Sequence, residues 1–485
     1  MSSEQAKAGG CRGQHAVVIG ASMAGLLGGR VLSDHFERVT IIERDRLPES
    51  AEARKGVPQG RHVHGLLSKG AAILKEFFPD LFPALVKEGS SCVDTLADVC
   101  WYYFDVWKLQ FPSDMVGYSQ SRPFLEQHVR EHLAARSNVF FMDECEVARL
   151  RSNDDNTRVT GVQLRHRSTD QHEEELAADL VVDASGRGSQ APQWLSSMGY
   201  GEVRETIVKV DVGYATRIYR RTGQTPFDGK VLIIYPTPPG KRAGYVFPIE
   251  GDCWMVTLAG WLRDYPPYDE PGFLDYARSL PVPDLYEAIK DAEPVTPIAT
   301  HKFPSNQRRH YERMSRLPEG FVVLGDAACS FNPIYGQGMT TAALEAKTLE
   351  TCLDQQSRLR SRGDLTGLAR RFQKALARVV DVPWLLATCE DFRHPETVGY
   401  RSPGKGLLNW YTARVHVLAG SHPAVTLRLY QVLNMLKPPT VLFEPRVLFP
   451  VLFKRRALQV EHEATMKFHR TQQRNQPAET EQLRS

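Results

Sequence analysis

The stretch Val322-Val-Leu-Gly-Asp-Ala-Ala-Cys-Ser-Phe-Asn-Pro-Ile-Tyr-Gly-Gln-Gly-Met339 decides the fold of this chain. A short apolar run, typical of a buried strand, ends at Asp326, and residues 340–353 are compatible with a helix. A carboxylate at the carboxyl end of a strand can accept hydrogen bonds from sugar-like hydroxyls. Gly336 and Gly338 let the backbone approach a ring system, and the helix N-terminus that follows favours negative charge. The stretch predicts a strand–loop–helix unit that holds a large planar ligand; two turn glycines in an ordinary unit are the plain alternative.

A second element near the N-terminus is a β-rich run with a tight glycine turn, His15-Ala-Val-Val-Ile-Gly20-Ala-Ser22-Met-Ala-Gly25. A helix-length segment and another β-rich run follow, ending at Glu43-Arg44, which is the layout of a dinucleotide-binding βαβ unit. Ser22 replaces the second glycine of GxGxxG, and its small hydroxyl can donate to a phosphate. Glu43 suits ribose hydroxyls. Together the two elements predict one dinucleotide site.

At these motifs the sequence resembles the FAD-dependent class A flavoprotein monooxygenases, the aromatic-hydroxylase-like superfamily. A third motif, Asp183-Ala-Ser-Gly186 within residues 179–189, falls where that family has its central Asp-Gly motif. Its altered form is more similar to the epoxidase, prenyl-reductase and halogenase branches. The segment 56–64 further resembles a bacterial subgroup that includes polyene and polyketide epoxidases. The resemblance covers roughly residues 14–375.

The resemblance implies a set of cofactor contacts. In the family, the arginine at the position of Arg122 reaches the FAD pyrophosphate or ribityl chain, and Arg61 lies near the ribityl chain and the substrate entrance. Pro333 corresponds to the proline that holds the loop against the ring face. Because the flavin carries the reactive chemistry, Arg61 and Pro333 are only candidates for a catalytic role. The full set of FAD-binding positions that it implies is Gly20, Ser22, Gly25, Glu43, Arg44, Arg61, Arg122, Asp326, Pro333, Gly336, Gly338 and Met339.

The family's chemistry then follows as an expectation. NAD(P)H acts as a transient co-substrate that reduces the flavin, and a flavin C4a-hydroperoxide epoxidises or hydroxylates a hydrophobic substrate. The branch suggests a polyene-, polyketide- or terpenoid-like molecule of secondary metabolism. The altered central motif leaves open whether a separate flavin reductase supplies the electrons. Three alternatives remain: a reductase of prenyl-type double bonds, a flavin halogenase, although the Trp-x-Trp-x-Ile-Pro signature is absent, and a non-catalytic flavoprotein.

The expected fold is α/β: a discontinuous Rossmann-like (GR2-type) FAD-binding domain with an inserted antiparallel β-sheet substrate domain and a helical C-terminal region. We assign residues 14–95, 121–205 and 298–375 to the first, 96–120 and 206–297 to the second, and 376–470 to the third. Residues 1–13 and 471–485 are predicted to be flexible tails. Residues 207–260 alternate apolar and polar side chains, which predicts a half-buried sheet that walls a pocket. Aromatic residues proposed for that pocket, or else for plain core, are Trp101, Tyr103, Tyr235, Phe247 and Trp254.

Two local predictions concern secondary structure. Ser121-Arg122-Pro123 is typical of a helix start, with the helix reaching about residue 136. The runs 140–150 and 158–166 flank the polar turn 152–156 and predict a hairpin.

Composition excludes several classes. The 60 basic and 57 acidic residues leave a net charge of +3, so we expect no nucleic-acid partner. Eight cysteines are scattered without a CxxC pair, and His62 and His64 lack a third ligand, so we expect no metal and a cytoplasmic location. The apolar segment 441–453 and the basic residues 454–456 suggest weak contact with a membrane surface or a substrate entrance, or a helical cap on the core. The partners that the family resemblance implies are a hydrophobic small molecule and dioxygen.

Overall fold

The computed structural model describes residues 13–167, 173–221 and 226–453. Its first layer is a five-stranded parallel sheet with the strand order β17-β11-β1-β2-β7. These strands are β1 (Gly13–Ile19), β2 (Phe36–Ile42), β7 (Val139–Met142), β11 (Leu180–Asp183) and β17 (Phe321–Val323). The carboxyl ends of parallel strands meet at one edge of a sheet, so the turn after β1, Glu43 after β2, Asp183 and the Gly325-Asp326 pair converge there. The predicted α/β fold is confirmed.

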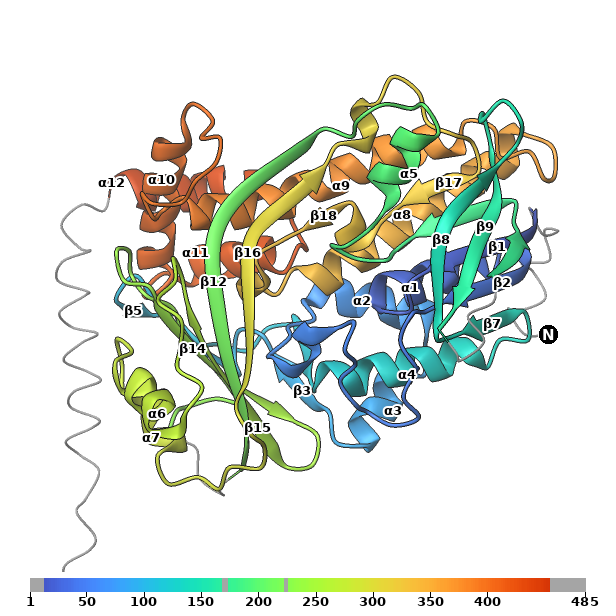
Figure 1. The fold of residues 1–485 in the computed structure, drawn as a ribbon. Coiled ribbons are helices and arrows are strands. Elements are labelled where there is room, and N and C mark those ends of the chain that lie inside the picture. Colours follow the sequence, from blue (N-terminus) through green and yellow to red (C-terminus); the bar gives the residue numbers. More distant parts are fainter. Residues whose placement is uncertain (1–12, 168–172, 222–225, 454–485) are drawn as a thin grey trace, which may run out of the picture.

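Helices and a small antiparallel sheet complete this part of the molecule (Figure 1). The sheet has the order β10-β9-β8, and its hairpin of β8 (Cys145–Ser152) and β9 (Val159–His166) confirms the predicted one; β10 is Glu173–Ala177. The helices are α1 (Met23–Leu32), α2 (Ser68–Phe77), α3 (Leu81–Lys87), α4 (Arg122–Ala134), α5 (Ala191–Ser197), α8 (Gly338–Leu359) and α9 (Leu368–Asp391). The predicted helix start is also confirmed, since the Ser121 hydroxyl accepts a hydrogen bond from the Phe124 N–H and caps α4.

The second layer is an eight-stranded sheet with the order β18-β16-β12-β15-β14-β13-β4-β5. Figure 1 shows its long strands β12 and β16 running from the parallel-sheet region into the second sheet. The strands are β4 (Val99–Tyr103), β5 (Val106–Trp107), β12 (Glu205–Arg220), β13 (Val231–Ile234), β14 (Arg242–Ile249), β15 (Cys253–Gly260), β16 (Ala299–Arg309) and β18 (Cys329–Ser330). β3 (Ser91–Asp94) pairs instead with β6 (Val116–Ser119). β16 thus belongs to this sheet, although the sequence placed residues 298–309 with the cofactor domain.

The central strands of this sheet are covered on both faces, which corrects the expectation of a half-buried sheet. All eight residues of β15 are buried. On β4, Trp101 and Tyr103 face one apolar cluster with the C-terminal helices, whereas Cys100 and Tyr102 face another beneath α6 (Glu270–Arg278) and α7 (Asp284–Ile289). Because successive side chains of a strand point to opposite faces, a strand between two covers needs apolar residues throughout.

The C-terminal region is helical, as predicted. It comprises the end of α9, then α10 (Lys405–Leu418), α11 (Pro423–Leu433) and α12 (Pro445–Phe453). The short 3-10 turns within the described residues are η2 (Pro58–Arg61), η3 (Tyr311–Arg313), η4 (Gly325–Ala327), η5 (Pro333–Tyr335) and η6 (Pro439–Phe443). The boundary predicted at residues 375/376 falls inside α9. Leu442, Val447 and Val451 pack in the core, which supports the helical-cap interpretation of residues 441–453. The basic residues 454–456 and both predicted tails, apart from Gly13, lie outside the described residues. No helix in the described ranges combines the length and apolarity that a bilayer crossing needs.

Candidate functional site

The turn after β1 needs glycine for steric reasons. Gly20 has φ +102°, and a Cβ there would lie 2.6 Å from the Ala184 carbonyl oxygen. A Cβ on Gly25 would lie 1.8 Å from the carbonyl oxygen of Gly20, so the helix α1 can approach the turn only with glycine at this position. Ser22 caps α1 without a side-chain bond to the helix. Its hydroxyl instead accepts from Arg122 (2.8 Å) and donates to Glu126 (3.1 Å).

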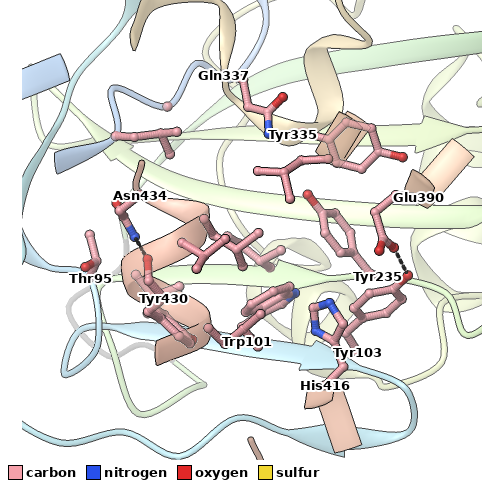
Figure 2. Close-up of a pocket in the computed structure, with 18 of the residues that line it drawn as sticks. Thr95, Trp101, Tyr103, Tyr235, Tyr335, Gln337, Glu390, His416, Tyr430 and Asn434 are labelled. Atoms are coloured by element: carbon pink, nitrogen blue, oxygen red, sulfur yellow. Dashed lines mark hydrogen bonds between the residues drawn. The ribbon is translucent and has the colours of Figure 1, made fainter. Parts of the chain in front are cut away.

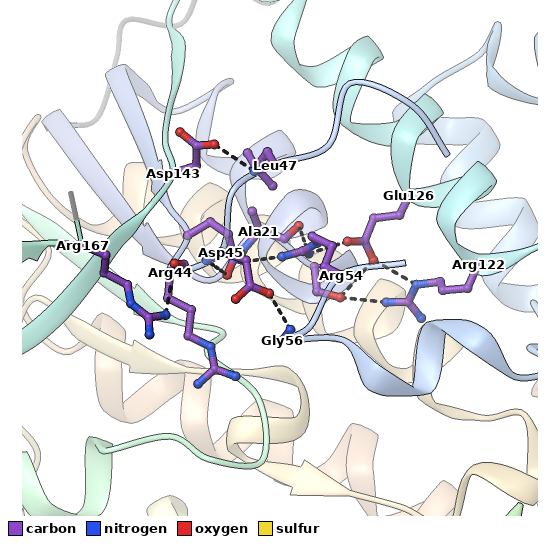
Figure 3. A network of polar contacts seen from close by, with 12 residues as sticks. Ala21, Arg44, Asp45, Leu47, Arg54, Gly56, Arg122, Glu126, Asp143 and Arg167 are labelled. Atoms are coloured by element: carbon purple, nitrogen blue, oxygen red, sulfur yellow. Dashed lines mark hydrogen bonds and ion pairs between the residues drawn. The ribbon is translucent and has the colours of Figure 1, made fainter. Parts of the chain in front are cut away.

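A buried network of charges surrounds this turn (Figure 3). Arg54 pairs with Glu43 at 2.7 Å and with Glu126 at 2.5 Å, while the Arg122 Nε donates to Glu126 at 3.0 Å. Burial alone would raise the pKa of Glu126, but Arg122 and Arg54 outweigh burial and lower it. Sequence reasoning named Glu43 and Arg122 and missed Arg54 and Glu126, which have no motif of their own.

The predicted residues Glu43 and Arg44 differ in their surroundings. The Glu43 carboxylate already accepts from the N–H groups of Ala21 (2.9 Å) and Asp45 (3.1 Å), besides its ion pair with Arg54. A carboxylate has about four acceptor positions, so about one remains for a ribose hydroxyl. Arg44 is exposed, and its side chain extends away from the Arg54–Glu126 pair in Figure 3.

The central motif and the Gly325-Asp326 pair lie on neighbouring strands. The Asp183 carboxylate is fully buried and accepts from the Ser185 N–H (3.0 Å) and hydroxyl (2.5 Å) and the Ser189 hydroxyl (2.5 Å), so it holds its own loop together. The Asp326 side chain is accessible to solvent. Desolvation raises the pKa of Asp326, and Arg122 and Arg187 oppose this rise. Arg187, which follows Gly186 in the motif, was not predicted as a site residue.

A buried carboxylate fixes the loop 330–336. Asp391 accepts hydrogen bonds from the side chains of Asn306 (2.7 Å), Asn332 (2.8 Å) and Tyr335 (2.8 Å). Burial raises the pKa of Asp391 to about 6, against the lowering effect of these donors. Asp391 lies on α9, far from the loop in sequence, and no sequence motif indicated that it belongs to the site.

The loop that Asp391 holds leaves room for a ligand beside its glycines. Gly336 has φ +64°, and a Cβ there would contact the backbone of Gly65 at 3.7 Å. Gly338 is exposed, and a Cβ there would meet no atom within 4 Å, so the N-terminus of α8 is open. The Met339 side chain is buried in the core, which limits this residue to contacts through its backbone. Pro333 is half-buried and begins the turn η5.

The segment 58–64 lines the same region. Arg61 is exposed at the end of η2. His62 is buried, its Nδ1 lies 2.7 Å from the Thr216 hydroxyl, and burial lowers its pKa to about 3. Burial, followed by the nearby Arg122, lowers the pKa of His64 to about 4. Both rings are therefore neutral at pH 7. Among the described residues no group of three or more potential ligands is arranged to hold a metal ion.

Two cavities adjoin this loop. The larger, here called the aromatic cavity, measures about 260 Å³ and is lined by four of the five predicted pocket residues, namely Trp101, Tyr103, Tyr235 and Phe247 (Figure 2). The smaller, called the histidine cavity, measures about 130 Å³ and is lined by His62, His64, His301, Tyr214, Tyr245 and the stretch 333–336, among others. Tyr235, Phe247 and Tyr335 line both cavities, so the two meet at the loop.

Trp254 requires a correction. Its side chain is 1% exposed and packs in the apolar cluster with Phe227 and Phe273, on the face of the sheet that α6 and α7 cover. It lines neither of the two cavities. The alternation of side chains along β15 decides this, because Trp254 shares its face with Val256 and Leu258 rather than with the cavity side.

The geometry defines a class of protein. A Rossmann-like glycine turn, an acid after the second strand, an accessible aspartate after the last strand and an open helix N-terminus fit the adenosine, pyrophosphate and ribityl parts of a flavin dinucleotide. The glycine-lined loop beside two cavities leaves room for its ring. The residues present thus fit FAD, and the chain has the fold and site of an FAD-binding flavoprotein.

Comparison with known proteins agrees with this class. The model of the FAD binding domain family matches residues 14–366, and the chain belongs to that family. Protein Rv3254 of Mycobacterium tuberculosis (strain ATCC 25618 / H37Rv) is 34% identical over 392 residues, 78% of this chain and 81% of that protein.

Solved structures share the fold at low identity. The flavin-dependent brominase Bmp2 superimposes with a TM-score of 0.63 at 14% identity, covering 95% of this chain and 100% of that chain. The p-nitrophenol 4-monooxygenase PnpA of Pseudomonas putida DLL-E4 gives 0.58 at 15%, covering 87% and 99%. The protein is therefore an FAD-binding protein of the fold that flavin-dependent monooxygenases and a brominase share.

Proposed function

We propose that this protein is an FAD-dependent monooxygenase that transfers one oxygen atom of dioxygen to an uncharged, hydrophobic small molecule. The reaction is an epoxidation or hydroxylation of a polyene-, polyketide- or terpenoid-like substrate, with NAD(P)H as transient reductant. The observation that carries the proposal is the aromatic cavity. It is closed mainly by apolar and aromatic side chains and reaches Tyr335 and Gln337 of the cofactor loop. When bound, FAD supplies the activated oxygen, and such chemistry needs a site that excludes water.

The proposed cofactor contacts divide by the part of FAD that they serve. Arg122 donates to the pyrophosphate, which an arginine fork suits, and the remaining acceptor position of Glu43 takes a ribose hydroxyl. The Ser22 hydroxyl, whose hydrogen goes to Glu126, accepts from Arg122 and so positions it. Asp326 accepts from the ribityl chain. The open N-terminus of α8 at Gly338 favours negative charge on the reduced ring. In this arrangement Arg54 and Glu126 position Ser22, Glu43 and Arg122 without contacting the cofactor.

The cavity wall offers little acid–base chemistry. Glu390 lines the cavity, but it is ionised and engaged by Arg393 (2.8 and 2.9 Å) and the Tyr103 hydroxyl (2.6 Å). Burial lowers the pKa of His416 well below its usual range, so its ring is neutral. A neutral wall of this kind supports an alkene or another uncharged substrate, since epoxidation needs no protein base.

The reductase, the halogenase and the non-catalytic flavoprotein are distinguished in one assay. The purified holoprotein is mixed with NADH or NADPH and a panel of isoprenoid alcohols, polyenes and naphthols under ¹⁸O₂, with bromide in a parallel set. The expected product gains one ¹⁸O, with oxygen uptake coupled to its formation. A product that gains two hydrogens without oxygen uptake would establish the reductase, and a brominated product would establish the halogenase. No conversion of any substrate, with or without an added flavin reductase, would establish the non-catalytic protein. We also propose a cytoplasmic location, because the seven cysteines among the described residues are all free, as is usual in a reducing compartment.

A further inference from the structure

One end of the aromatic cavity gathers polar atoms that lack partners. The indole Nε1 of Trp101, the Nδ1 of His416 and the hydroxyl of Tyr430 make no hydrogen bond to any other residue in the described part of the chain. Their side chains are 7%, 4% and 4% exposed. A buried donor left without a partner is unfavourable, and native proteins keep few of them. Three at one place in a ligand-sized cavity point to a polar group of the ligand.

The three side chains meet although they come from three elements. Trp101 lies on β4, His416 on α10 and Tyr430 on α11. The Trp101 ring lies 5.4 Å from the His416 ring and 5.7 Å from the Tyr430 ring, centroid to centroid. Figure 2 shows them together on one side of the cavity, with Tyr335 and Gln337 of the cofactor loop on the other. A ligand that spans the cavity therefore has one end at the loop and its other end at Trp101.

The remaining wall indicates the charge of that ligand. Glu390 is the one charged residue among the described residues that line the cavity. Its carboxylate is already engaged by Arg393 and the Tyr103 hydroxyl and is therefore not offered to a ligand. Lys108, whose Nζ lies 5.5 Å from the centre of the Trp101 ring, is 4% exposed and donates to the backbone carbonyls of Tyr103 (2.6 Å) and His416 (2.8 Å). No cation is therefore available to a carboxylate substrate, and burying an unpaired anion there would be costly.

The identity of the donors indicates the polar group. An indole N–H can only donate, so the ligand must present an acceptor to Trp101. A neutral imidazole and a phenol can each donate as well, and a carbonyl oxygen accepts two hydrogen bonds. We propose that the Trp101 end of the cavity binds the carbonyl oxygen of an uncharged ketone, while the apolar remainder of the molecule extends to the cofactor loop. This inference rests on the proposed function and names the class of its substrate.

The test compares two ligands of one shape, 9-fluorenone and fluorene, with 9-oxofluorene-2-carboxylate as the anionic member. Their dissociation constants are measured on oxidised holoprotein without NAD(P)H, by titration of the flavin absorbance and by calorimetry. We expect fluorenone to bind about tenfold more tightly than fluorene and the carboxylate to bind most weakly. Trp101→Phe should reduce the ketone preference to about twofold or less, whereas Trp410→Phe, at a 46% exposed position on α10, should preserve it.

A spectroscopic measurement separates a lost hydrogen bond from lost packing. Bound fluorenone should show a carbonyl stretch lowered by hydrogen bonding, and the shift should relax in Trp101→Phe and in part in Tyr430→Phe, which keeps the ring. Equal preference for the two neutral ligands in the wild type, an unchanged preference in Trp101→Phe, or tightest binding of the carboxylate would each overturn the inference. Because no oxygen transfer is involved, these results are independent of whether the monooxygenase assay succeeds.

Discussion

The substitution Glu390→Gln tests how the C-terminal helices are held on the cavity. Glu390 lies near the end of α9 and accepts two hydrogen bonds from Arg393, which also donates to the Asn409 carbonyl (2.9 Å) and the Thr412 hydroxyl (2.7 Å) of α10. Burial alone would raise the pKa of Glu390, but Arg393, with the hydrogen bond from the Tyr103 hydroxyl, lowers it from 4.5 to about 2. A depression of this size corresponds to about 3 kcal/mol of stability at pH 7. Glutamine keeps the shape and leaves the guanidinium of Arg393 buried without its charge partner, which costs a similar amount.

The sign of the pH dependence follows from the lowered pKa. The stabilisation is fully present above the unfolded value of 4.5 and is lost as pH falls towards about 2. Hydrogen exchange of α10 peptides at pH 7, read by mass spectrometry, should therefore be about 100-fold faster in Glu390→Gln than in the wild type. The difference in stability, from urea unfolding at pH 7 and pH 4, should shrink by about 1 kcal/mol at the lower pH.

The matched control is Glu287→Gln, which removes an exposed carboxylate from its pair with Lys290 on the sheet's other side. An exposed pair contributes at most about 1 kcal/mol, so α10 exchange should not change. Protection of α10 within threefold of the wild type in a folded Glu390→Gln variant would refute the reasoning.

Three further predictions concern the cofactor site, the loop and the C-terminal surface. Asp326→Ala should weaken FAD binding about tenfold or more, read from the ratio of absorbance at 450 and 280 nm, while the exposed Asp275→Ala keeps it; full retention in Asp326→Ala contradicts the assigned role. The raised pKa of Asp391, about 6 against 3.8, means that its contribution is most favourable below pH 3.8 and declines through pH 6. Wild-type stability from urea unfolding should thus fall by about 1 kcal/mol between pH 5 and pH 8 relative to Asp391→Asn, and parallel pH profiles would disprove this. Of the interpretations of residues 441–453, weak membrane-surface contact predicts that replacing Phe449 and Phe453, 57% and 74% exposed, with Ser lowers cosedimentation with anionic vesicles; equal binding argues against such contact.

Local patterns were sufficient for the cofactor unit. The turn at Gly20 excludes a side chain because of φ and close backbone contacts, and the strand before Asp326 is a plain apolar run. Both signals are short-range, since they depend on the residue's own backbone and its immediate neighbours. The parallel sheet then brings the separate motifs to one edge, a consequence that the βαβ pattern already contains.

The charged partners inside the site could not be predicted in the same way. Arg54, Glu126 and Asp391 are ordinary polar residues in the sequence, and each becomes significant only because folding buries it beside groups distant in the chain. An ion pair that contributes little at the surface interacts strongly when buried, and burying its charges costs desolvation energy. The effect of these three residues on the site therefore depends on where they lie and not on their residue type.

The sequence by itself determined that the chain binds a flavin dinucleotide and identified the aromatic run that begins at Trp101. Only the tertiary structure decided which aromatic residues face a cavity. It turned Trp101 towards His416 and Tyr430, more than 300 positions later in the chain, and turned Trp254 to the opposite face. Which face of a two-sided sheet a helix covers is set by long-range packing, because both faces of a fully buried strand are apolar and the alternation alone cannot distinguish them.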